Sequence, residues 1–311
     1  MFMKQILLSN KQLKMSIGPY KIGILHLAVD PLTYYLPVST EQFLDNNEIH
    51  MQVLDISYVI QLEDSFREPE DVPVTGLDEG PSPYRIYRVG SGDYLWIRKK
   101  SNRQIKLVYR ISENWSVWTL LVDNSGSQGT HSFAELAYIF AYSILNKGGI
   151  LFHGVVMEWM GMGIIVCAHS GVGKTTHTRM WRDTENALIL NGDRALCCKQ
   201  ENKWYAYGAP WSGSSQEYRN CKTPLVAVVI LEQEEENQVS ILSPLQGALE
   251  LIGLTFAPIW EERLLNCSLD TIDNIVQSIP VFKLKCKPEL ESVKVLKVEL
   301  EKLMNSSKRN V

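Results

Sequence analysis

The segment that most constrains the fold is residues 164–176, where an apolar run is followed by a glycine-punctuated turn and then by the tripeptide Lys-Thr-Thr. The apolar residues Ile164–Cys167 predict a buried strand, and the stretch from Lys174 to about Asp183 predicts a helix. This is the strand–loop–helix setting of a phosphate-binding loop. Ala168 stands at the first position of that signature, where the strict pattern has glycine.

The residue types in this segment suit a phosphate ligand. Gly171 and Gly173 allow backbone angles and a close approach that a Cβ would forbid, and successive backbone N–H groups at a helix start attract anions. Lys174 supplies a charge to the β and γ phosphates, and the Thr175 hydroxyl can bind Mg²⁺. We therefore predict a site for ATP and Mg²⁺; the alternative is a helix cap with an incidental lysine. The predicted nucleotide-binding residues are Ser170, Gly171, Val172, Gly173, Lys174, Thr175 and Thr176.

Length and composition describe an ordinary globular protein. The chain has 311 residues, of which 45% are hydrophobic and 21% are charged, enough for two domains or one large one. A net charge of −4 gives no electrostatic support for a nucleic-acid partner. The six cysteines lack disulfide-framework spacing, which favours reduced thiols. Without a signal-peptide pattern or a long apolar stretch, we expect a cytoplasmic protein with no membrane partner.

The pattern of strands and turns predicts a β-rich N-terminal domain, residues 1–128, and an α/β domain, residues 129–311, joined at the polar stretch 123–129. The segment 68–83, rich in proline and acids, predicts an exposed loop. The N-terminal domain either has only a core face and a solvent face or carries a substrate-docking surface, and strand patterns do not separate these. Its predicted strands are Met51–Leu62, Tyr84–Val89, Tyr94–Lys99, Ile105–Ile111 and Val117–Val122.

Strands and helices intermix in the second part of the chain. The predicted strands there are Ile150–Glu158, Gly163–Cys167, Ala187–Leu190, Ala195–Cys198, Trp204–Tyr207, Leu225–Glu232 and 280–286. Besides the helix after the loop, helices are predicted over 259–265, 269–278 and 288–304, and one opens at Ser243-Pro244, where proline suits the first helical position.

Three further residues are candidates for chemistry. Asp193 lies eighteen residues after Thr175, at the end of a predicted strand, where a magnesium ligand or a base belongs; the alternative is an Asn-Gly-Asp hairpin turn. His153 lies on the strand before the one that feeds the loop, and the alternative is a packed core histidine. Arg219 lies in a polar stretch that either closes over a transferred phosphate or is a solvated connection. His177, beside the loop, is expected to pack or to face solvent.

Several segments together resemble the HPr kinase-related ATPases, which share a nucleotide-binding core with ATP-dependent phosphoenolpyruvate carboxykinases. The likeness covers roughly residues 130–290. It implies an α/β fold with a phosphate-loop core of mixed sheet and flanking helices. The matching segments are Leu151–Gly154, Ser170–Trp181, Asn191–Arg194, Tyr207–Gly213 and Pro224–Leu231.

The resemblance implies phosphoryl transfer from ATP to a hydroxyl, often a serine on a protein or on a precursor peptide. Lys174 and the loop amides then hold the β and γ phosphates, Thr175 and Asp193 hold Mg²⁺, and Asp193 with His153 handles the substrate proton. We therefore predict a kinase of a peptide or protein hydroxyl, with no nucleic-acid or membrane partner, compatible with a homo-oligomer.

The chain departs from these relatives in ways that leave alternatives open. They usually carry two consecutive acids where this chain has Gly192-Asp193, and they tend to carry lysine where Ser214 stands. Asp193 must then serve as either magnesium ligand or base, unless another carboxylate such as Glu232 takes one role. The alternatives are a nucleotide-binding regulatory module without chemistry and a kinase of small molecules. Carboxykinase chemistry is disfavoured because the sequence identifies no His/Lys/Asp set for a second metal.

Overall fold

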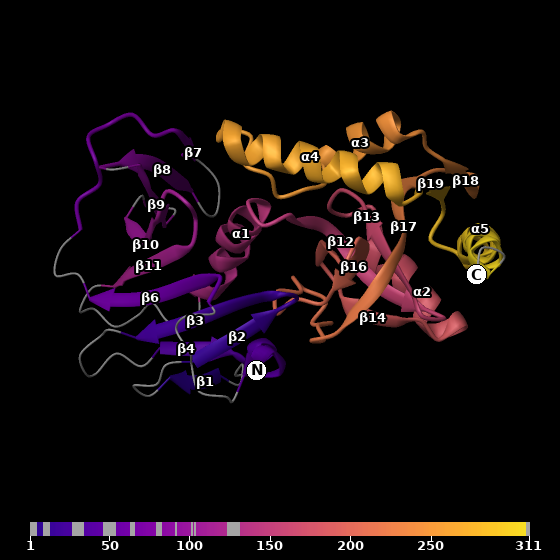
Figure 1. Ribbon diagram of the computed structural model, residues 1–311, viewed down its shortest axis with the longest axis horizontal. Helices are drawn as coiled ribbons and strands as arrows, with labels where there is room; N and C mark the ends of the chain where they lie inside the picture. Colours follow the sequence, from indigo (N-terminus) through magenta and orange to yellow (C-terminus); the bar gives the residue numbers. More distant parts are fainter. Residues whose placement is uncertain are drawn as a thin grey trace. The chain divides into compact units, whose positions relative to one another are not determined.

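The computed structural model describes residues 5–8, 13–26, 34–45, 54–62, 66–78, 83–90, 92–100, 102, 104–122 and 131–308 (Figure 1). Contacts within the chain divide it into two compact units, Met1–Ser143 and Ile144–Val311. The stretch 123–129, which the sequence marks as a boundary, lies outside the described residues. Both units combine mixed sheets with few helices, as in an α/β protein.

Within the described residues, the N-terminal unit is built on a nine-stranded sheet in the order β5-β2-β3-β6-β11-β10-β9-β8-β7. Strand β6 runs parallel to its neighbours β3 and β11, whereas the hairpin neighbours are antiparallel. The strands are β2 (Leu13–Ile17), β3 (Tyr20–His26), β5 (Leu44–Asp45), β6 (Ile56–Leu62), β7 (Thr75–Leu77), β8 (Tyr84–Val89), β9 (Asp93–Lys99), β10 (Ile105–Ile111) and β11 (Val117–Val122). Separately, β1 (Gln5–Leu8) pairs with β4 (Tyr34–Pro37), and the 3-10 helix η1 spans Val38–Phe43.

Helix α1 (His131–Leu145) packs on this sheet through aromatic and polar contacts. The indole N–H of Trp118 donates to the Ser143 hydroxyl at 2.9 Å, and the ring of Trp96 stacks on Tyr142 with centroids 5.8 Å apart. Burial of one large apolar side chain contributes about 1.5–3 kcal/mol, so the aromatic core accounts for much of this unit's stability.

The predicted strands from Tyr84 to Val122 are confirmed with nearly the predicted bounds. The predicted exposed loop 68–83 is wrong in part, because the short strand β7 lies inside it and pairs with β8. Two of the three residues of β7 are exposed, so no alternation of buried and exposed residues marks this edge strand.

The C-terminal unit holds an eight-stranded sheet within the described residues. Its long strands β12 and β17 each pair with different strands along different parts of their length. Its strands are β12 (Gly149–Trp159), β13 (Met162–Cys167), β14 (Leu188–Asn191), β15 (Arg194–Gln200), β16 (Lys203–Tyr207), β17 (Lys222–Gln233), β18 (Gln238–Ile241) and β19 (Val281–Cys286). Its helices are α2 (Lys174–Glu185), α3 (Pro244–Ile252), α4 (Glu262–Ser278) and α5 (Leu290–Lys308).

Strand pairing closes part of this sheet on itself. Residues 149–153 of β12 pair with β15, and residues 154–159 pair with β13. β17 pairs with β16 at its start and then runs parallel to both β13 and β19. The strands β13, β12, β15, β16 and β17 therefore form a ring, and β19 and β18 extend the sheet beyond β17.

Two features of this unit differ from the sequence prediction. The helices predicted over 259–265 and 269–278 are one helix, α4, because its buried face continues through Leu264, Ile272 and Ile275 across the less helix-favouring Asn-Cys-Ser stretch. The edge strand β18 was not predicted, since it is only four residues long and mostly exposed.

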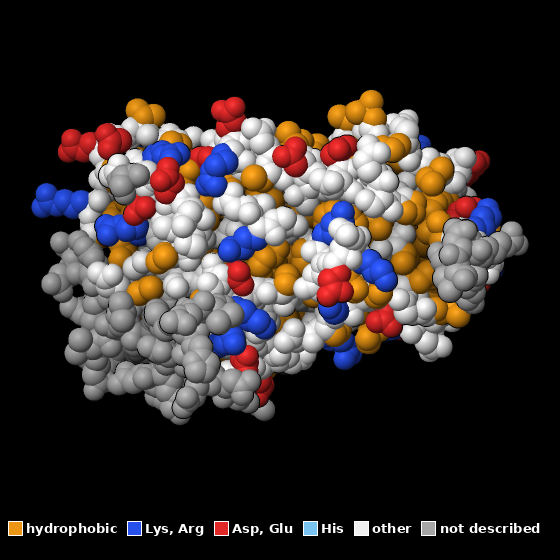
Figure 2. All heavy atoms as spheres, in the orientation of Figure 1, with side chains coloured by type: hydrophobic (Ala, Val, Ile, Leu, Met, Phe, Trp, Pro, Cys, Tyr) orange, Lys and Arg blue, Asp and Glu red, His pale blue; other side chains and the backbone are white. Residues whose placement is uncertain are grey.

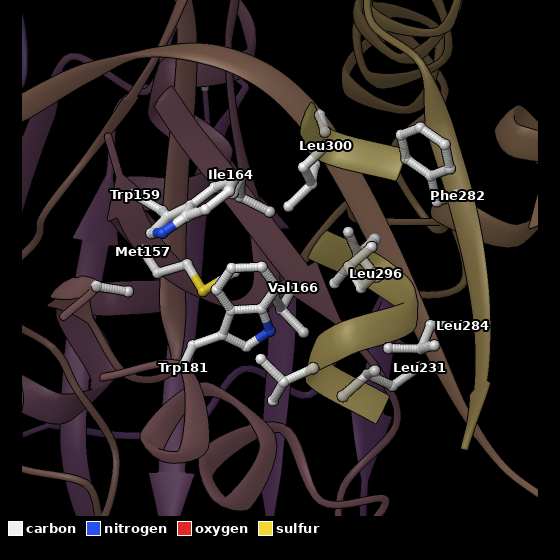
Figure 3. Close-up of a cluster of buried hydrophobic side chains, with 14 of the residues drawn as sticks. Met157, Trp159, Ile164, Val166, Trp181, Leu231, Phe282, Leu284, Leu296 and Leu300 are labelled. Atoms are coloured by element: carbon white, nitrogen blue, oxygen red, sulfur yellow. The ribbon is translucent and has the colours of Figure 1, made fainter. Parts of the chain in front are cut away.

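Helices α2 and α5 cover one face of the sheet over a buried apolar cluster (Figure 3). Trp159 and Trp181 meet edge to face with ring centroids 5.1 Å apart, next to Leu296 and Leu300 of α5 (Figure 3). Every residue of β13 is buried. The strand that leads into the glycine loop is therefore held rigidly by the core.

The surface carries charges of both signs. On the face shown in Figure 2, Lys and Arg side chains are interspersed with Asp and Glu, and hydrophobic side chains lie among them. Of the helices that the structure describes, none combines the length and apolar character needed to cross a membrane.

Candidate functional site

The glycine loop has the predicted strand–loop–helix geometry. β13 ends at Cys167 and α2 begins at Lys174. Between them, Gly171 and Gly173 have φ angles of +84° and +108°, in the left-handed region that favours glycine. A Cβ on either glycine would meet nothing within 4 Å. The backbone at both glycines is therefore open to an approaching ligand.

The start of α2 offers unsatisfied donors. Gly173 is the N-cap residue and makes no side-chain cap hydrogen bond. The first N–H groups of a helix have no acceptor inside the helix, and they carry the positive end of the helix dipole. Ser170 and Gly171 are exposed beside this helix start, and Thr175 and Thr176 lie in its first turn. The arrangement can bind an anion through its backbone.

Val172, inside the loop, and Gln233, outside it, anchor the loop to the rest of the unit. Val172 packs against the buried cluster of α2 and α5, and its carbonyl accepts a hydrogen bond from the Gln233 amide at 3.3 Å. The neighbouring Glu232 instead pairs with Lys283 at 3.2 Å. Successive residues of a strand point to opposite faces, so Gln233 reaches the loop and Glu232 does not.

Lys174 is buried and folded back over the start of the loop. Its Nζ donates to the carbonyl of Ala168 at 2.8 Å and to that of His169 at 3.3 Å. It also lies 3.4 Å from the Nε2 of His153. Burial lowers the pKa of Lys174, the charge of Asp193 opposes that change, and the charge of Arg194 adds to it.

His153 connects Lys174 to Asp193. Its Nε2 lies 3.3 Å from the Oδ1 of Asp193, and the N–H of the next residue, Gly154, donates to the Asp193 carbonyl at 3.1 Å. A proton on Nε2 would be donated to the carboxylate, whereas an unprotonated Nε2 would accept from the lysine. A cation, an imidazole and a carboxylate thus stand in one hydrogen-bonding row. The resemblance implied that His153 lies near Asp193, whereas the contact between His153 and Lys174 was not predicted.

Asp193 has a second cationic partner that the sequence analysis missed. The Nη1 of Arg194 lies 2.5 Å from the Oδ2 of Asp193. Burial raises the pKa of Asp193, but the His153 hydrogen bond and the charges of Arg194, His153 and Lys174 outweigh it, so the net pKa is lowered. The carboxylate is therefore ionised near neutral pH. The signal that could have revealed Arg194 is its position next to the acid, on the strand facing His153.

Asn191 holds the turn that carries Asp193. Its side chain is fully buried; its Oδ1 accepts from the N–H groups of Asp193 at 2.9 Å and Arg194 at 2.6 Å. Its Nδ2 donates to the carbonyls of Ala209 at 2.7 Å and Trp211 at 3.0 Å. The alternative of a hairpin turn is wrong, because β14 and β15 pair with different parts of β12 and not with each other.

The segment 208–221 lies along this turn. Gly213 has a φ of +57°, and a Cβ there would come within 2.8 Å of the Asp193 carboxyl carbon. The N–H of Arg219 donates to the Leu190 carbonyl at 2.8 Å, and its side chain is exposed. Among the described residues, no contact joins the Arg219 side chain to Lys174, His153 or Asp193. A side chain at position 213 would clash with the acid, which explains the glycine there.

His177 belongs to the core and not to the row of charged groups. The indole N–H of Trp181 donates to its Nε2 at 3.1 Å, and its Nδ1 lies 3.2 Å from the Ser292 hydroxyl of α5. Burial lowers the pKa of His177 to about 4. Its role is to join α2 to α5, which agrees with the expectation that it packs.

The donors available for a metal are few. In the described part of the chain, no group of three or more His, Cys, Asp and Glu side chains could hold a metal ion. The hydroxyl of Thr175 and the carboxylate of Asp193 are hard oxygen donors of the kind that Mg²⁺ prefers. Mg²⁺ usually keeps several waters and binds through one or two carboxylates plus phosphate oxygens. The Thr175 hydroxyl and the Asp193 carboxylate could therefore hold Mg²⁺ only together with a bound phosphate.

Comparison with known proteins identifies a family. Residues 124–289, just over half of the chain, match the family model described as SynChlorMet cassette protein ScmC. The match includes the glycine loop and the row around Asp193. None of the curated proteins matches the chain. Among solved structures, the Hpr(Ser) kinase/phosphatase from Coxiella burnetii is similar at 8% identity and a TM-score of 0.30, covering 51% of this chain and 96% of that one.

Proposed function

The chain belongs to the family of the SynChlorMet cassette protein ScmC, and we propose that it transfers the γ-phosphoryl group of ATP to a serine-type hydroxyl on a peptide or protein. The observation that carries the proposal is the row Lys174–His153–Asp193 beside an open glycine loop and an uncapped helix start. Backbone donors for an anion and a lysine next to an acid are the parts that phosphoryl transfer requires.

The loop would bind the phosphates of ATP through its backbone. Residues Ser170–Thr176 supply the N–H groups, and Lys174 supplies the charge. The lysine Nζ now donates to two loop carbonyls, which an anionic phosphate would outcompete because hydrogen bonds between charged groups are stronger. Thr175 and the phosphate oxygens would hold Mg²⁺, which leaves Asp193 for the role of base. The bound ion supplies charge neutralisation for the phosphates.

Asp193 would accept the proton of the acceptor hydroxyl. The hydroxyl oxygen forms a bond to the γ-phosphorus, the bond from that phosphorus to the bridging oxygen breaks, ADP leaves with the electron pair, and the proton passes to the carboxylate. Asp193 is ionised and held by His153, so it is ready as an acceptor. A loose transition state needs little activation of the nucleophile, so a weakly basic carboxylate suffices.

A second function is a nucleotide-binding regulatory module without transfer. The observation that favours it is the single acid at the site, since Asp193 is paired with Arg194 and Glu232 is paired with Lys283. Such a module would bind ATP with little dependence on Mg²⁺, because no metal-assisted step follows.

The test is phosphoryl transfer from labelled ATP to serine-containing peptides, with ATP affinity measured by calorimetry with and without Mg²⁺. Replacing Lys174 with alanine removes the lysine charge from the phosphates, so transfer should fall by about a thousandfold or more. The matched control is Lys294→Ala, whose side chain is 71% exposed on α5 and which should behave as wild type. Tight ATP binding without transfer or hydrolysis would favour the regulatory module. Absence of ATP binding would overturn both functions, and transfer only to small hydroxyl compounds would overturn the peptide acceptor.

A further inference from the structure

Arg194 is placed by the sheet on the same face as His153. It is the first residue of β15, and the two strands pair in register His153↔Arg194. Directly opposite residues of an antiparallel pair share a face, with Cβ atoms about 5 Å apart. The imidazole and the guanidinium therefore both reach Asp193, which each contacts through a different carboxylate oxygen.

An aromatic ring holds the guanidinium in this position. The Arg194 Cζ lies 4.2 Å from the centroid of the Phe256 ring, and the same ring meets His153 edge to face at 6.2 Å. Only 17% of the Arg194 side chain is exposed. A cation stacked on an aromatic face and largely shielded from water keeps a defined orientation.

Within the described part of the chain, cationic side chains lie on two sides of Asp193. Lys174 and Arg194 are two cations beside one carboxylate, and the Arg194 charge lowers the pKa of Lys174, which places the two cations close enough to repel each other. Cationic side chains that lie close together in a half-buried site attract an anion. A terminal phosphate supplies several negative oxygens, and the planar guanidinium fork matches it.

We propose that Arg194 binds the terminal phosphate of the nucleotide, so that the site distinguishes ATP from ADP. The inference rests on the proposed function and adds to it the residue that recognises the group to be transferred. The competing role is purely structural: Arg194 would only orient Asp193. A structural role would change the affinities for ATP and ADP by the same factor, because neither nucleotide would contact the guanidinium.

The test is calorimetric binding of ATP and of ADP to wild type, Arg194→Gln and Arg194→Lys. Loss of one charged hydrogen-bond donor to phosphate should weaken ATP binding by about tenfold to a hundredfold, while ADP binding changes by less than about twofold. Arg194→Lys keeps the charge but not the fork, so its ATP affinity should lie between the other two. The matched control, Arg263→Gln, removes an exposed arginine of α4 that hydrogen-bonds Asn146, and both its affinities should match wild type.

Each outcome decides the inference. Equal losses of ATP and ADP affinity in Arg194→Gln, unchanged affinities, or a wild type that binds the two nucleotides equally would overturn the role of Arg194 while the proposed function stands. If the wild type binds neither nucleotide, both fail together. Circular dichroism and thermal melts verify folding, and if the glutamine variant does not fold, Arg194→Lys provides the same ATP-to-ADP comparison.

Discussion

Both units of this protein contain a partly buried carboxylate that contacts several cations. In the N-terminal unit, Glu68 accepts a hydrogen bond from the Tyr87 hydroxyl at 2.6 Å and pairs with Lys99 at 2.7 Å and Arg85 at 3.4 Å. In the C-terminal unit, Asp193 contacts His153 and Arg194. Burial would raise both carboxyl pKa values, and in both clusters the hydrogen bonds and cations lower them below normal.

The two clusters differ in what lies beside them. Glu68 joins the segment 66–78 to strands β8 and β9, and Arg85 also pairs with Asp78 of that segment at 2.7 Å. Asp193 instead stands in a row that leads through His153 and Lys174 to a glycine loop and an uncapped helix. A carboxylate among cations is therefore not in itself a reason to propose a functional site. The open donors beside the Asp193 cluster are what make it the candidate.

The largest effect is expected from neutralising the acid of the C-terminal cluster, which tests whether this cluster differs in function from the Glu68 cluster. Asp193→Asn removes the proposed proton acceptor, so the transfer rate should fall by about a hundredfold to ten-thousandfold. ATP affinity should change by less than about threefold, since the loop and Lys174 remain. Single-turnover transfer and calorimetry separate the two effects, and equal losses in both would show that Asp193 serves binding and not proton transfer.

His177 and Lys174 lie on the same helix, but His177 is packed in the core whereas Lys174 belongs to the candidate site. A change at His177 should therefore affect stability. Its pKa of about 4 in the fold lies below the ordinary value of 6.5, so the unfolded chain binds the extra proton between these pH values. The free energy of unfolding should be unaffected above pH 6.5 and should fall by up to about 3 kcal/mol as the pH drops to 4. Urea unfolding measures this against His177→Gln, which should lack that part of the pH dependence. Identical pH slopes in the two proteins would contradict the assignment.

The smallest expected effect comes from the matching change in the N-terminal cluster. Glu68→Gln leaves Lys99 and Arg85 with a weaker acceptor, which should lower the free energy of unfolding by about 1 kcal/mol. Transfer and ATP affinity should be unchanged. Chemical denaturation and the transfer assay test this, and a large loss of transfer would give the Glu68 cluster a functional role that its contacts do not indicate.

Much of the site could be predicted from local pattern. Glycine spacing, the lysine and the preceding apolar run predicted a strand, a loop and a helix with nearly the observed bounds, because backbone preferences act over a few neighbouring residues. The proximity of His153 and Asp193 followed from the resemblance. The role of Arg219 could not be settled in this way, since its distance from the row depends on how the segment 208–221 crosses β14.

Other features depend on pairings between distant residues. Three contacts join positions up to some sixty residues apart: the pairing of β13 with β17 that closes the ring, the placement of Arg194 opposite His153, and the approach of Gly213 to Asp193. The alternation along β17 turns Glu232 toward Lys283 and Gln233 toward the loop. A shift of one residue in register would exchange these faces, and the register is set by packing throughout the unit.

The amino-acid order alone therefore predicted which chemical groups the candidate site contains: a glycine loop with a lysine, a threonine hydroxyl and a following acid. Which cations surround that acid, which carboxylate is kept away from it and which histidine is buried in the core were settled by folding. The physical reason is the distance along the sequence over which each kind of interaction acts. Backbone angles and side-chain chemistry are local properties of the chain, whereas charge balance at a site is a sum over groups that only strand register and core packing bring together.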